Sequence, residues 1–354
     1  MTLYERIADL PLHIEEYSLE RHERETSSDF TRATTVVSLF SDDAVGQGED
    51  VTYELEEHDA LRDTDPEWDL AGEYTMKSFS AALDNIDLFF GRDPGETFRH
   101  YRRWAFESAA LDLALRQSKT NLGQVLDRRY DPVRFVISTR LGDSPATERI
   151  ETWLDHYPDA EFKLDPTPDW TADVIEDLVA TGAVRTLDLK GFYEGSGVDN
   201  PADPDLYRRI IDGFPEAVIE DPRLTDDTSE LFAGEEGRVS WDYPITGVES
   251  IESLPFEPRW LNIKPSRFGT VESVLDSIEY CLERDIHCYG GGQFELGVGR
   301  EHIQTLASLF YPDSPNDVAP SEYNAPEPRA DLPESPLVAP AAPAGLGFVE
   351  EDAP

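Results

Sequence analysis

The sequence predicts an α/β fold, in which a TIM-type (β/α) barrel follows a smaller α+β domain. A chain of 354 residues is too long for one small domain and indicates a large domain together with a smaller one. Strand-like segments precede helix-like segments near the N-terminus, whereas the two kinds alternate from Asp131 onward. Alternating strands and helices are typical of a parallel sheet, and segregated ones of an α+β domain.

Residues 1–130 have the pattern of an antiparallel meander followed by helices. Alternation of apolar and polar residues predicts strands at 13–21, 31–40 and 44–49. Helical periodicity predicts helices at 77–90 and 102–115. The second helix contains AFESAALDLAL, whose small residues allow close packing.

Residues 131–318 have the pattern of the barrel. Short apolar runs predict strands at 133–138, 161–164, 185–189, 217–219, 238–241, 260–263 and 286–289, and helix-like stretches lie between several of them, at 171–180, 207–211, 271–283 and 301–310. Seven or eight such units in about 190 residues suit a β/α barrel, although a (β/α)₈ domain usually has about 250. A doubly wound sheet is the alternative. Its dinucleotide-binding version has no support, because no G-x-G-x-x-G follows an early strand.

The composition is strongly acidic, with 74 Asp and Glu against 30 Lys and Arg and a formal net charge of −44. We interpret this as a salt-adapted surface, which argues against binding nucleic acid or anionic membranes. No segment approaches the roughly 20 apolar residues of a membrane span, and the N-terminus lacks signal-peptide features. Two cysteines, Cys281 and Cys288, are too few for a disulfide framework or a zinc site. We therefore expect a reduced, cytoplasmic protein.

Carboxylates and amines end successive strand-like runs of the barrel. Only five lysines occur, and three of them, Lys163, Lys190 and Lys264, lie in such runs. Asp188 and Glu220 are 32 residues apart, and intervals of 22 residues separate Glu220 from Asp242 and Asp242 from Lys264. Each interval fits one β/α unit, so these residues should lie on the C-terminal rim, where barrel enzymes place their active sites. Any single acid of this kind is more often solvated or capping than a metal ligand.

Three carboxylates that converge from adjacent strands require a counter-charge to stay ionised. Oxygen ligands suit Mg²⁺, with Mn²⁺ as an alternative. We therefore predict a metal site formed by Asp188, Glu220 and Asp242. An amine beside such a cation has a lowered pKa and can act as a base near neutral pH.

In these residues the sequence resembles the enolase superfamily, in its branch of muconate cycloisomerase, o-succinylbenzoate synthase and mandelate racemase. The metal-binding Asp, Glu and Asp of that family match Asp188, Glu220 in an I-E-x-P motif, and Asp242. Its strand-six lysine matches Lys264 in N-I-K-P-S-R-x-G. The resemblance implies a capping domain at 1–130 and a C-terminal segment, 319–354, that returns to it through Gly345-Leu346-Gly347. The acidic composition suggests a salt-adapted, haloarchaeal-type member of that family.

Two motifs depart from the family pattern. The strand-two K-x-K reads Lys163-Leu164-Asp165, and the strand-three D-x-N reads Asp188-Leu189-Lys190. Residues i and i+2 of a strand face the same side, so all four charges should face the barrel mouth. Either Lys190, held by Asp165, replaces the missing catalytic lysine, or the two form a structural ion pair and Lys264 works alone.

Four further residues are candidates for substrate binding. Tyr193 begins a long loop after the third strand, and loops at this rim shape specificity. Gly291 lies in a Gly-Gly-Gly run that allows close backbone approach to a ligand. Glu295 follows it, either as a supporting acid or as the cap of the next helix. Arg267 belongs to the strand-six motif.

The resemblance implies Mg²⁺-dependent abstraction of a proton α to a carboxylate, through a metal-stabilised enediolate. Elimination, cycloisomerisation and epimerisation share this step. One base favours elimination, and two bases on opposite faces permit epimerisation. The alternative is a non-catalytic barrel that binds a small carboxylic acid, because Asp165 replaces the usual lysine. The expected partners are a small carboxylate and further copies of the chain in a homo-oligomer.

Overall fold

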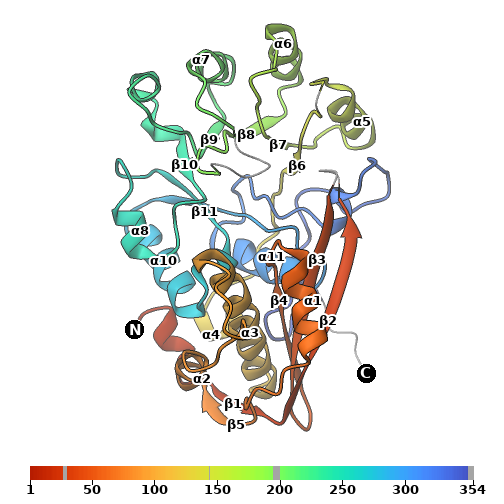
Figure 1. The fold of residues 1–354 in the computed structure, drawn as a ribbon. Helices are drawn as coiled ribbons and strands as arrows, with labels where there is room; N and C mark the ends of the chain where they lie inside the picture. Colours follow the sequence, from red (N-terminus) through yellow and green to blue (C-terminus); the bar gives the residue numbers. More distant parts are fainter. Residues whose placement is uncertain (27–29, 143, 194–199, 350–354) are drawn as a thin grey trace.

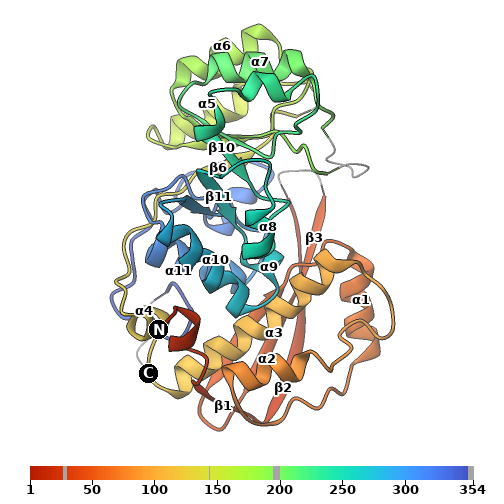
Figure 2. The same cartoon turned by 90° about the vertical axis from the view of Figure 1, so that its left-hand side faces the viewer.

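The computed structural model describes residues 1–26, 30–142, 144–193 and 200–349. An antiparallel sheet with a long helix forms the N-terminal part, and a curled parallel sheet with its helices forms the rest (Figure 1). Helices α5, α6 and α7 lie at the end of the molecule far from the N-terminal part, whereas α8 to α11 lie between (Figure 2). No helix among these described residues is long and apolar enough to cross a membrane.

The N-terminal part is built on a three-stranded antiparallel sheet, ordered β2-β3-β4. Helix α3 packs on this sheet, and Gly46 and Gly48 of β4 make the close approach possible. A Cβ at Gly48 would lie 2.0 Å from the carbonyl oxygen of Ala105, so only glycine fits there. The elements of this part are β1 (Pro11–Ile14), β2 (Glu16–Glu25), β3 (Thr31–Phe40), β4 (Val45–Asp50), α1 (Leu55–Thr64), β5 (Gly72–Thr75), α2 (Met76–Leu83), α3 (Glu96–Gln117) and α4 (Leu122–Leu126), after a short 3₁₀ turn at Tyr4–Arg6.

The second part contains seven parallel strands whose spatial order, β6 to β12, is their order in the chain. This pattern confirms the predicted α/β fold class. The strands are β6 (Ile137–Thr139), β7 (Phe162–Leu164), β8 (Val184–Asp188), β9 (Val218–Glu220), β10 (Val239–Trp241), β11 (Trp260–Ile263) and β12 (His287–Gly290). The helices are α5 (Glu148–His156), α6 (Ala172–Thr181), α7 (Pro204–Gly213), α8 (Val248–Glu252), α9 (Pro265–Phe268), α10 (Val271–Glu283) and α11 (Gly299–Phe310).

A short extended segment connects the two edges of the parallel sheet. Asn316 forms a parallel bridge with Phe135, and Asp317 forms one with Gly291. The amide of Val136 donates to the Asn316 carbonyl at 2.8 Å, and the amide of Asp317 donates to the Gly290 carbonyl at 2.8 Å. Two bridging residues therefore take the eighth position of the barrel in place of a full strand.

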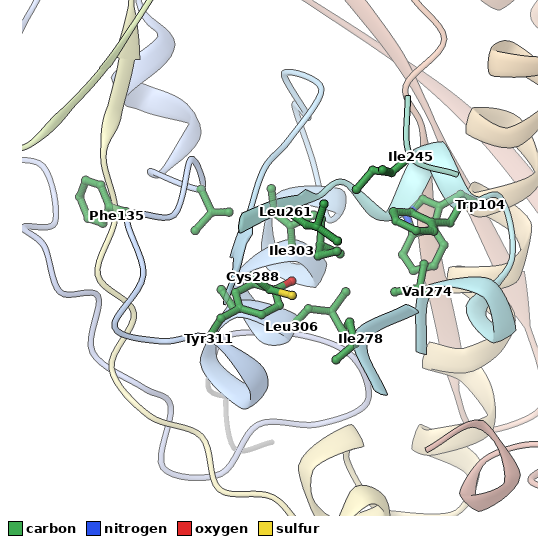
Figure 3. Packing of buried hydrophobic residues seen from close by; sticks show 14 of the residues in the cluster. Trp104, Phe135, Ile245, Leu261, Val274, Ile278, Cys288, Ile303, Leu306 and Tyr311 are labelled. Carbon is green, nitrogen blue, oxygen red and sulfur yellow. The ribbon is translucent and has the colours of Figure 1, made fainter. Parts of the chain in front are cut away.

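The N-terminal part and the barrel share one hydrophobic core. Leu261 of β11 and Ile303 of α11 point toward each other beneath the sheet, and Trp104 of α3 lies beside Val274 of α10 (Figure 3). Burial of such apolar surface is the main favourable term in folding. This contact holds the N-terminal part against the C-terminal half of the barrel.

The C-terminal segment returns to the N-terminal part. Gly345 bridges Asn121 beside α4, and the amide of Leu346 donates to Asp112 of α3 at 2.8 Å. Gly345 has a φ of +60°, and a Cβ there would lie 2.0 Å from the Asp112 carboxylate. Glycine at this position therefore allows the segment to lie against α3, as the resemblance implied. Residues 350–354 lie outside the described part of the chain.

Candidate active site

Three carboxylates meet at the C-terminal ends of neighbouring strands. Asp188 ends β8 and Glu220 ends β9, and the two are paired across the sheet. Asp242 follows β10, and Lys264 follows β11. The carboxylates are fully buried and Lys264 is 5% exposed. The predicted spacing of one β/α unit therefore brings these four side chains to one rim.

The ammonium group of Lys163 lies between two of these carboxylates. Its Nζ is 2.7 Å from Glu220 Oε1, 3.3 Å from Asp188 Oδ2 and 3.5 Å from Asp317 Oδ2. Burial by itself would lower the pKa of Lys163, but the attraction of Glu220 and Asp188 raises it well above the ordinary value. Lys163 is therefore a buried positive charge that stays protonated between these carboxylates.

Asp242 is held by two cations. Lys264 donates to its Oδ2 at 2.8 Å, and Arg267 Nε donates to its Oδ1 at 3.0 Å. Burial opposes ionisation, but Arg267 and Lys264 keep the pKa of Asp242 well below its usual range. Tyr193 is part of the same cluster, because its hydroxyl accepts from Arg267 Nη2 at 2.8 Å and donates to Asp242 at 3.3 Å.

Of the three predicted metal ligands, Glu220 is the one whose pKa is raised. Tyr289 donates to its Oε2 at 2.5 Å, and Asn262 donates to its Oε1 at 3.2 Å. Burial, followed by repulsion from Asp188, raises the pKa of Glu220 to about 7 in spite of Lys163. The ammonium group of Lys163, 2.7 Å away, therefore does not fully offset burial and the repulsion from Asp188.

The exchanged pair Asp165 and Lys190 is also on this rim. Lys190 Nζ lies 2.5 Å from Asp188 Oδ2 and 3.7 Å from Asp165 Oδ1, and Arg140 Nε holds Asp165 Oδ2 at 2.9 Å. The expectation that Asp165 holds Lys190 is wrong for a hydrogen bond, since 3.7 Å is too long. Lys190 instead donates to Asp188. Burial by itself would lower the pKa of Lys190, but Asp165 and Asp188 raise it.

Two family models match the chain. Residues 5–125 match the N-terminal domain, and residues 129–325 the C-terminal domain, of a domain of unknown function, DUF8230. The chain belongs to the DUF8230 family.

Relatives and solved structures connect this DUF8230 protein with the enolase superfamily. The o-succinylbenzoate synthase of Listeria innocua is 25% identical over 227 residues, which are 61% of this chain and 58% of that protein. The match thus spans less than two thirds of the curated relative's length. An enolase-superfamily protein from Listeria innocua has a TM-score of 0.68 at 16% identity, covering 96% of this chain and 95% of that one. A dipeptide epimerase from Methylococcus capsulatus, complexed with Mg and L-Arg-D-Lys, has a TM-score of 0.73 at 17% identity, covering 96% and 100%. The fold is that of the enolase superfamily, which confirms the resemblance seen in the motifs.

The donor set of this DUF8230 protein fits a hard divalent cation by its chemistry. Three buried carboxylates supply oxygen ligands, and a further positive charge would favour the ionised form of Glu220, whose pKa is raised. In the observed conformation ammonium and guanidinium groups contact each carboxylate. Within the described ranges, no three Asp, Glu, His or Cys side chains form a ready-made metal cluster.

Two residues predicted to bind substrate, Gly291 and Glu295, lie at different distances from the three carboxylates. Gly291 touches the site, since a Cβ there would lie 2.3 Å from Asn262 Oδ1 and 2.8 Å from Lys264 Cε. Glu295 instead pairs with Arg300 at 2.9 Å and accepts from the Gln293 amide at 2.6 Å. Glu295 therefore shapes the loop that carries Gly291.

Several residues of the site were not predicted. Asn262 and Tyr289 contact Glu220, and Asp317 faces Lys163. Asp221 accepts from the amides of Asp242 and Tyr243, each at 2.9 Å, and so fixes the turn after β10. The Glu220-Asp221-Pro222 motif was a signal for Asp221, whereas nothing in the sequence separates Tyr289 from an ordinary core tyrosine.

Proposed function

We propose that this protein is an enzyme that removes a proton α to the carboxylate of a small organic acid. The substrate then loses a leaving group or undergoes cycloisomerisation. One observation carries the proposal. The amine of Lys264, almost fully buried, lies 2.8 Å from Asp242 on a rim that also contains Asp188 and Glu220. Barrel enzymes place their active sites at this rim, and a lysine amine there is a candidate base for proton abstraction.

Asp188, Glu220 and Asp242 would hold the divalent cation, Mg²⁺ or Mn²⁺. When bound, that cation would stabilise the negative charge that develops on the substrate carboxylate as the α-proton leaves. The Mg in the dipeptide epimerase complex supports the choice of metal. The pKa of Glu220, which stays raised in spite of Lys163, is consistent with a further cation beside this carboxylate.

Lys264 is the base of the proposed reaction, and Tyr193 and Arg267 orient it. Arg267 holds one oxygen of Asp242 while Lys264 donates to the other, which directs the amine along the rim. We assign Tyr193 and Gly291 to the substrate-facing side, because both border this cluster. Glu295 supports Gly291 through the loop that both share.

A single base favours elimination or cycloisomerisation over epimerisation. The strand-two position that would supply a second base is Asp165, which Arg140 holds at 2.9 Å. Lys163 forms ion pairs with Glu220 and Asp188, so we do not assign it as a second base. The o-succinylbenzoate synthase relative is consistent with this choice.

A second candidate is a barrel that binds a small carboxylic acid without turnover. The observation that favours it is the pairing of Asp188, Glu220 and Asp242 with lysines and Arg267. Such a site is nearly neutral without metal and can persist as a structural network.

Proton exchange in D₂O distinguishes the two candidates. The pure protein is incubated with a library of small carboxylic acids, with Mg²⁺ or with EDTA, and loss of each α-proton signal is followed by NMR. The enzyme hypothesis predicts Mg²⁺-dependent exchange or turnover of at least one acid. Binding of an acid, seen in the same spectra, without exchange under either condition would favour the second candidate.

A further inference from the structure

Two carboxylates compete for one lysine at the edge of the site. Lys190 Nζ lies 2.5 Å from Asp188 Oδ2 and 3.7 Å from Asp165 Oδ1. Arg140 already occupies Asp165 Oδ2, so Oδ1 is the oxygen directed to Lys190. The side chains of Lys190 and Asp165 are each 15% exposed, whereas Asp188 is fully buried. Lys190 therefore has a buried partner and a more accessible partner within reach of its flexible side chain.

The backbone at Lys190 does not favour a lysine. Its φ of +53° is in the left-handed region, which costs a residue other than glycine roughly 1 kcal/mol and is better tolerated by asparagine. Its amide donates to Asp188 Oδ1 at 3.1 Å, so an asparagine would keep the turn. Lys190 is thus a strained residue beside the site that asparagine could replace without losing the turn.

The amine of Lys190 and a divalent cation cannot both lie close to Asp188 without strong repulsion. Lys163 is the more firmly held of the two lysines, because its side chain is only 2% exposed and its closest bond, at 2.7 Å, is to Glu220. Lys190 has a route away from Asp188, because Asp165 is adjacent. The two departures from the family motifs thus supply both groups. Lys190 is the ammonium that competes for Asp188, and Asp165 is its alternative partner.

We propose that Lys190 is a displaceable counter-charge, which neutralises Asp188 when no divalent cation is bound and transfers to Asp165 when one binds. The inference rests on the proposed function, since it assumes that Asp188 is a metal ligand. It makes Asp165 and Lys190 regulators of metal affinity. Asp165 increases that affinity by accepting the lysine, and Lys190 decreases it by competing for Asp188.

A double-mutant cycle on Mg²⁺ affinity tests the proposal. Full-length wild type, Asp165→Asn, Lys190→Asn and the double variant are freed of metal with EDTA, dialysed, and titrated with Mg²⁺ by calorimetry at one pH and ionic strength. We expect Lys190→Asn to bind about tenfold more tightly and Asp165→Asn about tenfold more weakly than wild type. In the Lys190→Asn background, Asp165→Asn should change Kd less than about twofold.

A matched control separates the amine from the backbone. Lys119 is exposed and also has a φ of +53°, but it lies after α3, away from the rim. Lys119→Asn relieves the same strain, and we expect it to leave the Mg²⁺ affinity unchanged. Melting in EDTA gives a readout without metal, in which Lys190→Asn should melt lower than Lys119→Asn because Asp188 loses its counter-charge.

The outcomes separate this inference from the proposed function. Equal Mg²⁺ affinity in all four proteins, or an equal effect of Asp165→Asn in both backgrounds, would overturn the displaceable counter-charge and leave the metal site intact. Absence of Mg²⁺ binding in all four folded proteins would overturn the metal site and the inference together.

Discussion

At the scale of single residues, the sequence predicts the acidic and basic members of the site and misses their neutral partners. Asp188, Glu220, Asp242 and Lys264 are identifiable as a set, because they end successive apolar runs at intervals that each fit one β/α unit. Tyr289 was not identifiable, because its bond to Glu220 depends on how two non-adjacent strands face each other inside the barrel. The pairing of Lys190 with Asp188 also depends on side-chain geometry that no motif specifies.

Glu220 should make the metal-free protein sensitive to pH. Its pKa is raised to about 7 in the folded protein, whereas an unfolded glutamate titrates near about 4.3. Between these values the folded protein retains a proton that the unfolded chain releases. Stability from this group is therefore complete below about pH 4 and is lost as the pH rises through about 7.

We predict that in EDTA the free energy of unfolding of wild type falls from pH 5 to pH 8 by roughly 2–3 kcal/mol more than that of Glu220→Gln. Urea titrations at each pH measure this difference. Saturating Mg²⁺ should remove it, because the cation favours the ionised carboxylate. Parallel pH profiles of the two proteins in EDTA would contradict the assignment.

At the scale of elements, sequence periodicity predicts most helices and strands. It is wrong where side-chain hydrogen bonds or distant segments replace the regular backbone pairing. The segments 31–40, 260–263 and 271–283 are β3, β11 and α10 with the predicted bounds. The helix predicted at 77–90 ends at Leu83, because Asp87 accepts from the amides of Phe89 and Gly91 and so favours a turn. The strand predicted at 133–138 is mostly single bridges to the C-terminal segment, which local pattern cannot show.

The contact between β4 and α3 should be intolerant of any side chain at Gly48. A Cβ there would lie 2.0 Å from the Ala105 carbonyl, which belongs to a helix backbone that cannot shift alone. We predict that Gly48→Ala lowers the free energy of unfolding by about 3 kcal/mol or more, as measured in urea. Gly237→Ala is the control, since nothing lies within 4 Å of its Cβ position. Equal stability of the two variants would show that the sheet and helix are not packed this closely.

At the scale of the whole molecule, one buried carboxylate joins the N-terminal part to the barrel. Glu49 of β4 accepts from the amides of Leu296 at 2.7 Å, Gly297 at 3.0 Å and Gly299 at 2.8 Å, where α11 begins. These residues are about 250 positions apart, so the sequence alone did not reveal the contact. The loop that Glu49 fixes also carries Gly291 against Lys264.

Removing the charge of Glu49 should weaken this junction. In Glu49→Gln the amide nitrogen cannot accept, so at least one backbone donor loses its partner. We predict a loss of about 1–3 kcal/mol in the free energy of unfolding. The exposed Glu56→Gln should change it by less than about 0.5 kcal/mol. A wild-type urea midpoint for Glu49→Gln would mean that this carboxylate does not hold the two parts together.

Lys264 is the residue on which the proposed reaction depends most. The most direct test is the rate of Mg²⁺-dependent α-proton exchange in D₂O, measured by NMR on an acid that wild type processes, in Lys264→Met and in Lys77→Met. Lys77 is an exposed lysine of α2, so its variant controls for the substitution itself. We predict that Lys264→Met exchanges about 10³-fold more slowly or not at all, while it still binds Mg²⁺ and Lys77→Met exchanges at the wild-type rate. Exchange by folded Lys264→Met at the rate of Lys77→Met would contradict the account.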